Sequence, residues 1–194
     1  NITGVPISLH AATSLGDQLG DFYYPGQALV NFCNEKNKDW GLEGEVDESK
    51  YDIISERLLG VTFYVAAQLV EENIASVAET DIGARVGLRW PSGPFELMNN
   101  IGLEKAAALA RKCIEPFNLG LPKILDEKDS KTAQLESISS SISDNVYELA
   151  FMRPDAMNAL DPSSMIQLDG KLTAAKLSQK PIVLKGTGKA FVAG

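Results

Sequence analysis

The last nine residues, 186–194, combine three glycines with one lysine in the stretch "GTGKAFVAG", which directly follows the apolar run "PIVLK". A glycine-rich turn after a strand lets backbone N–H groups approach a phosphate or an oxyanion closely. A Walker-type phosphate loop needs a glycine at position 183 and a serine or threonine at position 190. Those positions hold Val183 and Ala190, so the sequence excludes that motif.

Few other side chains have types and spacings that indicate chemistry. Cys33 and Cys113 match no metal or redox spacing, and we interpret them as buried or half-buried free thiols. His10 is the single histidine, which argues against a zinc site built on histidines. Glu56 and Arg57 are interpreted as solvated or structural charges.

The composition is that of an ordinary globular protein, with 194 residues, 44% apolar and 23% charged. A net charge of -8 without a basic cluster argues against nucleic-acid and anionic-membrane partners. The first ten residues lack a secretion signal, and no segment approaches the roughly 18 consecutive apolar residues of a membrane helix. We therefore expect a soluble cytoplasmic protein.

Periodicity predicts an all-α region at residues 50–125. One predicted helix face carries Ile54, Leu58, Val61, Val65 and Leu69, and a second carries Ala106, Leu109, Ala110, Cys113, Ile114 and Phe117. A capping box at 76–79, or alternatively Thr80 and Asp81, begins a helix between them. A short helix follows Pro94 and ends near Gly102. Residues 1–47 show weak periodicity, with a turn at 25–26 and a short helix at 27–36.

The C-terminal quarter has a different pattern. Residues 126–144 are charged and then serine-rich, a composition typical of a linker. Residues 145–194 predict strand, helix and strand, with Asp161 as N-cap, Pro162 at the first helical position and a buried helix face of Met165, Leu168, Leu172 and Ala175. One β-α-β unit cannot cover both faces of a sheet, so we expect this unit to be incomplete.

The helical region resembles the C-terminal domain of 3-hydroxyacyl-CoA dehydrogenases. The resemblance covers about residues 50–120 and rests on "ERLL" (56–59), "LVEENIAS" (69–76) and "TDIGARVGLRWPSGPFELMNNIGL" (80–103). It implies an all-helical domain of the 6-phosphogluconate dehydrogenase C-terminal-like type at 48–125. The stretch "LGDFYYPGQALVNF" (19–32) looks like the tail of a preceding copy, at 1–47.

The chain also departs from that family. Family members bind NAD on a separate domain with a glycine fingerprint and use a histidine base, and this sequence has no strand followed by G-x-G-x-x-G that opens a helix. His10 lies far from any matching position. The resemblance therefore implies that NAD belongs to a parent enzyme, on a domain upstream or in trans, and not to these residues.

The last 50 residues resemble the beginning of the enoyl-CoA hydratase (crotonase) family. The matching blocks are "LAFMRPDAMNALDPSSM" (149–165) and "IVLKGTGKAFVAG" (182–194). The resemblance implies that Lys189, Ala190, Phe191, Ala193 and Gly194 lie along CoA. It also implies that the oxyanion-hole donors and the catalytic glutamates lie beyond Gly194.

Together these patterns predict a mainly α protein that ends in a partial α/β crotonase unit. The expected function is part of a bifunctional 3-hydroxyacyl-CoA dehydrogenase/enoyl-CoA hydratase of fatty-acid β-oxidation, acting on acyl-CoA thioesters as a homo-oligomer. The chain is expected to lack both complete active sites. The alternative is a non-catalytic helical module that mediates domain or subunit contacts.

Overall fold

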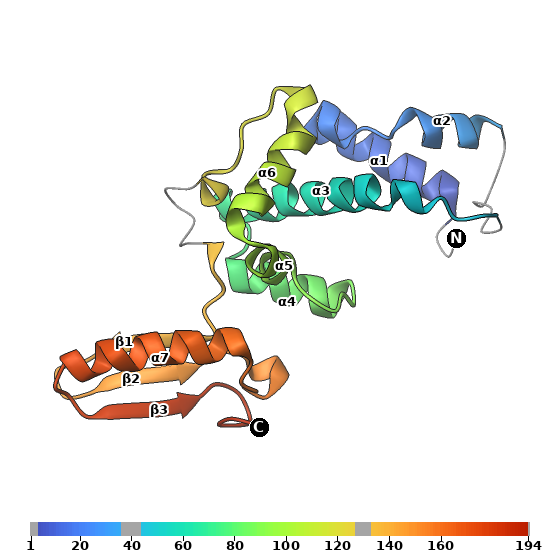
Figure 1. Ribbon diagram of the computed structural model, residues 1–194. Coiled ribbons are helices and arrows are strands. Elements are labelled where there is room, and N and C mark those ends of the chain that lie inside the picture. The colour runs from blue at the N-terminus through green and yellow to red at the C-terminus, as the bar shows by residue number, and fades with distance from the viewer. Residues whose placement is uncertain (1–3, 36–43, 127–132, 194) are drawn as a thin grey trace.

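The computed structural model describes residues 4–35, 44–126 and 133–193, which form a helical part and a smaller sheet part (Figure 1). The helical part contains α1 (Val5–Leu19), α2 (Gln27–Asn34), α3 (Tyr51–Glu71), α4 (Val77–Gly87), α5 (Pro94–Ile101) and α6 (Leu103–Ile114). Short 3-10 turns lie at Asp21–Tyr23, Glu48–Lys50, Glu115–Phe117 and Lys123–Leu125. No strand occurs in residues 4–35 or 44–126, so the all-α prediction for the described part of 50–125 is confirmed.

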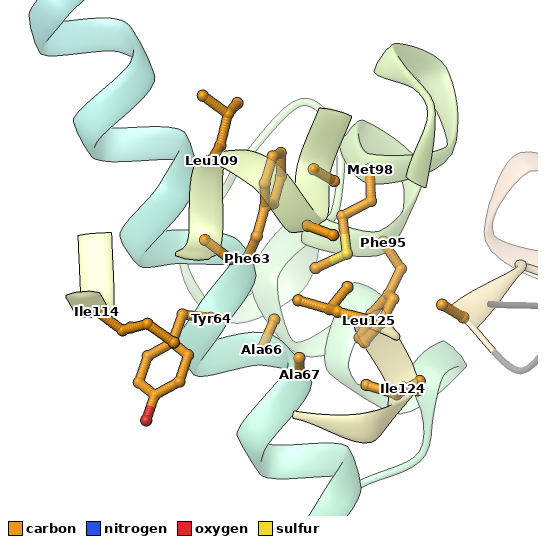
Figure 2. Close-up of a cluster of buried hydrophobic side chains, with 14 residues drawn as sticks. Phe63, Tyr64, Ala66, Ala67, Phe95, Met98, Leu109, Ile114, Ile124 and Leu125 are labelled. Atoms are coloured by element: carbon orange, nitrogen blue, oxygen red, sulfur yellow. The ribbon is translucent and has the colours of Figure 1, made fainter. Parts of the chain in front are cut away.

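The core of the helical part lies where α3 crosses α6 (Figures 1 and 2). Gly60 makes this crossing close, because a Cβ atom there would lie 2.5 Å from the Leu109 carbonyl oxygen and 2.5 Å from the Cys113 Sγ. Around it are the buried side chains of Phe63, Tyr64, Ala66, Ala67, Phe95, Met98, Leu109, Ile114, Ile124 and Leu125. Small residues on the two facing helices thus allow the large ones to interdigitate.

The predicted buried face of α3 is wrong in part. Ile54 and Leu58 are mostly exposed, while Val61, Val65 and Leu69 are half-buried. The buried face of α3 instead carries two aromatic residues and two alanines, Phe63, Tyr64, Ala66 and Ala67. Branched aliphatic residues dominated the sequence pattern, whereas close helix contact favours small residues beside a few large ones. The predicted α6 face is confirmed except for Phe117, which is half-buried against Phe22.

The segment Glu48–Glu71 passes the length and hydropathy criteria for a membrane-spanning helix, with a mean hydropathy of 1.4. Core helices of soluble proteins meet the same criteria, and this segment contributes Phe63, Tyr64 and Ala67 to the core. It is the single such helix among the residues that the structure describes.

The N-terminal helix α1 was not predicted. Only Val5 and Gly16 are buried on it, and Ile7, Leu15 and Leu19 are exposed. Because so little of α1 faces a core, its sequence carries no clear amphipathic period. The chain after it contacts the core through Phe22, whose ring meets Tyr64 edge-on at 5.0 Å.

The sheet part contains three strands and one helix. These are β1 (Ile138–Ile142), β2 (Tyr147–Phe151), α7 (Pro162–Leu177) and β3 (Ile182–Gly186). The order is β1-β2-β3, with β1 antiparallel to β2 and β2 parallel to β3. The predicted β-α-β unit is confirmed, including Asp161 as N-cap and Pro162 in the first turn. On α7, Leu168, Leu172 and Ala175 pack against the sheet as predicted, whereas Met165 is half-exposed.

The segment 126–144, whose composition predicts a linker, contains β1. This strand buries Ile138, while its serines and Ile142 remain partly or largely exposed. A strand at the edge of a sheet can be stabilised by backbone pairing and one buried side chain. Because the rest of β1 is polar, its sequence did not predict a strand. Strand β3 forms the opposite edge, and Ile182, Val183 and Leu184 are each about 40% exposed.

Candidate functional site

The glycine-rich loop after β3 folds back over the end of its own strand. A Cβ atom at Gly186 would lie 2.5 Å from the carbonyl oxygens of Ala190 and Phe191, so only glycine permits this return. Gly188 has a φ of +79°, and a Cβ atom there would lie 2.7 Å from the Pro154 side chain. The two glycines therefore allow the loop backbone to pack closely against its surroundings, as the sequence indicates for a glycine-rich turn after a strand.

Asn158 holds this loop from within the sheet part. Its side chain is 2% exposed, and its Nδ2 donates to the carbonyl oxygens of Thr187 at 2.9 Å and Ala190 at 2.8 Å. Its Oδ1 accepts from the Arg153 N–H at 2.9 Å. All three bonds satisfy buried polar groups, so Asn158 determines where the loop lies. The sequence reasoning placed Asn158 in a family motif but assigned it no role.

The turn at 153–158 supports the same loop. It contains the 3-10 turn Pro154–Ala156, followed by Met157 and Asn158 with φ values of +52° and +57°. The Met157 carbonyl oxygen accepts from the Ala193 N–H at 3.0 Å. A left-handed conformation is costly for methionine, so the surrounding contacts must maintain this turn.

The predicted CoA-contact residues have different environments. Lys189 is exposed and Phe191 is 55% exposed, while Ala190 and Ala193 are half-buried. The Phe191 ring meets Phe151 edge-on at 5.5 Å. Gly194 lies outside the described residues. The loop thus presents one cation and one aromatic surface beside a backbone fixed by Asn158, which suits a ligand with phosphate and apolar groups.

Asp161 caps α7 and joins it to the same turn. Its Oδ1 accepts from the Ser164 N–H at 2.7 Å and from the Ser164 hydroxyl at 2.8 Å, and its Oδ2 pairs with the Arg153 guanidinium. Burial opposes ionisation of this carboxyl, but the Ser164 hydrogen bonds and Arg153 outweigh it, so the pKa of Asp161 is lowered.

A second buried constellation lies in the helical part, at the corner between α4 and α5. The Asp81 carboxylate is 2% exposed and accepts from the N–H groups of Phe95 at 2.7 Å and Glu96 at 2.9 Å. A Cβ atom at Gly93 would lie 2.2 Å from the Asp81 Cγ. Burial raises the pKa of Asp81, while the two backbone N–H groups and the Arg85 charge oppose that rise.

This corner explains the spacing of the central sequence motif. Helix α4 begins with the predicted capping box of Ser76 and Glu79, not at Thr80 and Asp81. Asp81 instead satisfies the first N–H groups of α5 from a neighbouring helix, and Gly93 leaves room for it. The sequence analysis singled out the motif that contains Asp81 and Gly93, but it could not predict their contact, because the two residues are twelve positions apart.

The other side chains that the sequence singled out lie apart from both constellations, and Glu56 and Arg57 make structural contacts with α6. Glu56 pairs with Lys112 at 2.6 Å, and Arg57 Nη1 donates to the Cys113 carbonyl oxygen at 3.2 Å. Cys33 is half-buried and Cys113 is buried, and both are free thiols. His10 is exposed on α1. The described residues contain no group of three His, Cys, Asp or Glu side chains that could hold a metal ion.

An apolar groove runs between α3 and α4. Its volume is about 510 Å³, and Val61, Val65 and Leu69 of α3 line one side while Ala84, Leu88 and Trp90 line the other. Val61, Val65 and Leu69, three of the five residues that the sequence assigned to the buried face of α3, therefore line this surface groove.

Residues 53–132 match the family model described as 3-hydroxyacyl-CoA dehydrogenase, C-terminal domain. The central helical unit resembles that domain. The match runs from the first turn of α3 past the turn Lys123–Leu125 and includes the Asp81–Gly93 corner. Searches of curated proteins and of solved structures each gave no significant match.

The residues at hand do not fit an NAD site. A dinucleotide site needs a glycine-rich turn that leads from a strand directly into a helix, whose N-terminus faces the pyrophosphate. Gly186 and Gly188 follow β3, but no helix follows them in the described residues up to 193. The matched domain is also named as the C-terminal one.

Proposed function

We propose that this chain is part of a bifunctional enzyme of fatty-acid β-oxidation, a 3-hydroxyacyl-CoA dehydrogenase joined to an enoyl-CoA hydratase. The observation that carries the dehydrogenase half is the family match at 53–132, together with the Asp81 corner that its motif builds. The helical part would act with an NAD-binding domain supplied upstream or in trans. Its substrates would be acyl-CoA thioesters.

The hydratase half of the proposal rests on the loop 187–193. Its backbone is tied at Thr187, Ala190 and Ala193, so a ligand meets a loop that is already ordered. Lys189 would offer its charge to a CoA phosphate, and Phe191 would contact the adenine or pantetheine. These roles support binding and orientation of the thioester, and they transfer no proton.

We propose further that the 194 residues turn over neither substrate by themselves. The single histidine, His10, is exposed on α1 and lies outside the matched residues. The loop 186–193 contains no glutamate that could handle the proton of a water molecule. The proposed domain boundaries are 1–47, 48–125, 126–144 and 145–194, with homo-oligomers and a cytoplasmic location as in the sequence-based expectation.

A non-catalytic association module is the second candidate function. The apolar groove between α3 and α4 favours it, because half-buried Val65 and exposed Leu88 form a surface that a partner could cover. The two functions differ in what they predict for substrate. The association module binds a protein without binding CoA thioesters.

Activity assays test the dehydrogenase half. The purified chain is incubated with 3-hydroxybutyryl-CoA and NAD, and separately with crotonyl-CoA, and no turnover is expected. Adding the isolated NAD-binding domain of a 3-hydroxyacyl-CoA dehydrogenase is expected to give NADH formation above that of the added domain alone. Complex formation without added turnover favours the association module. Turnover by the chain alone contradicts the proposal that it lacks complete sites.

A further inference from the structure

One ion pair joins the helical part to the turn that supports the glycine-rich loop. Arg85, in the last turn of α4, pairs through Nη1 with the Asp155 carboxylate of the turn Pro154–Ala156. The two side chains are 26% and 35% exposed, so solvent screens this pair less than the exposed pair of Lys112 and Glu56. Arg85 Nε is buried and has no hydrogen-bond partner among the described residues. Asp155 is therefore the contact that positions this guanidinium.

The chain between the two parts is clamped on both sides. The Asn99 side chain of α5 donates to the Ala133 carbonyl oxygen at 3.1 Å and accepts from the Leu135 N–H at 3.0 Å. Gln167 of α7 donates to the Leu135 carbonyl oxygen at 2.9 Å and accepts from the Ser137 N–H at 2.8 Å. Residues 133–137 therefore hold α5 and α7 at a short separation, which brings Arg85 within reach of Asp155.

Asp155 lies next to the residues that determine the loop. Pro154, the residue before Asp155, packs against Gly188. Asn158, three residues after Asp155, donates hydrogen bonds to the carbonyl oxygens of Thr187 and Ala190. Between them Met157 holds a left-handed backbone conformation, which needs support from outside the turn. The Arg85 contact supplies such support from a different part of the chain.

We propose that Arg85 is a positioning residue for the loop 187–193, acting through Asp155 and the 153–158 turn. The helical part thereby determines how well ordered the loop is. This inference concerns the geometry of the loop and holds for any ligand that it binds. Its failure would leave the proposed function untouched, because the test measures amide exchange and not substrate.

The test is amide hydrogen exchange of the full chain, read at the N–H groups of Thr187 and Ala193, which donate to Phe151 and Met157. Arg85→Gln and Asp155→Asn are each expected to raise their exchange rates about twofold to fivefold, the range for an ion pair that is partly open to solvent. The double variant is expected to exchange no faster than either single variant. Asp155→Glu, which keeps the carboxylate, is expected to retain most of the protection.

Two features make the test specific. Burial raises the pKa of Asp81 and the Arg85 charge opposes that rise, so Arg85→Gln alone could act through the α5 corner, whereas Asp155→Asn leaves Arg85 and Asp81 unchanged. Lys112→Gln breaks an ion pair within the helical part and is expected to leave the loop amides unaltered. The proposal is overturned if Asp155→Asn leaves both loop amides at the original rate, if the single effects add, or if Asp155→Glu raises exchange as much as Asp155→Asn.

Discussion

At the scale of single residues, two buried side chains form hydrogen bonds with backbone groups that are far away in the sequence. Asp81 satisfies the first N–H groups of α5, and Asn158 satisfies two carbonyl oxygens of the loop after β3. Gly93 leaves space for the Asp81 side chain, and Gly186 leaves space for the backbone of Ala190 and Phe191, whose first carbonyl oxygen Asn158 binds. These pairs explain why both motifs combine glycine with a polar residue.

Gly93→Ala tests the first pair. The added Cβ atom would lie 2.2–2.6 Å from three atoms of the Asp81 side chain, so the carboxylate must move away from the Phe95 and Glu96 N–H groups. We expect a loss of about 2–4 kcal/mol in the free energy of unfolding of the helical part, measured by urea denaturation. Gly83→Ala is the matched control on α4, where a Cβ atom meets nothing within 4 Å. It is expected to stabilise by about 0.5–1 kcal/mol, and equal losses in both variants would contradict the assignment.

Asp161 predicts a pH dependence of the sheet part. Because its folded-state pKa is lowered, its contribution to stability is present above the unfolded-state pKa and is lost as the pH falls through the folded-state value. Asp161→Asn keeps an acceptor for the Ser164 N–H and removes the titration. Between about pH 7 and pH 3 we expect the original chain to lose about 0.5–1 kcal/mol more than this variant, a figure reduced for screening at a side chain 40% exposed.

The free energy is read from amide exchange of the β2 residues 147–151, which report on the sheet part alone. Asp169→Asn, an exposed site on the same helix, is the control and is expected to keep the pH dependence of the original chain. A pH dependence that Asp161→Asn leaves unchanged would show that another carboxyl governs it.

At the scale of elements, the sequence pattern predicted whether a segment is a helix or a strand better than it predicted which face of that element is buried. Helices α3 to α6, the strands β2 and β3, and the caps at Ser76 and Asp161 follow from periodicity and cap chemistry. The buried face of α3 did not, because Phe63, Ala66 and Ala67 pack on α6 in place of the branched residues. Strand β1 was hidden by its serines, and α1 by its small buried face.

The edge strand β3 carries a prediction of its own. Its side chains at 182–184 are about 40% exposed and it pairs only with β2, so local opening costs little contact area. In the isolated chain we expect amides 182–184 to exchange at least about 100-fold faster than those of the buried α3 residues 63–67. Equal protection of the two segments in a demonstrated monomer would contradict this expectation.

At the scale of the whole molecule, two parts with different architectures meet through the clamped residues 133–137 and through Arg85 with Asp155 (Figure 1). Sequence reasoning predicted both parts and their family resemblances, and the family match covers α3 to α6 of the helical part. It could not predict their contacts, because Arg85 and Asp155 are 70 positions apart and neither stands in a repeating pattern. The CoA-contact residues at 189–194 remain a prediction.

Titration with acetoacetyl-CoA, followed by isothermal calorimetry, tests the central claim that this chain binds CoA thioesters through the loop 187–193. We expect saturable binding that Asn158→Asp weakens at least about tenfold, because a carboxylate repels the carbonyl oxygens of Thr187 and Ala190. Asn118→Asp, an exposed left-handed asparagine on the helical part, is the matched control and should bind like the original chain. No saturable binding, or equal weakening by both variants, would contradict the claim.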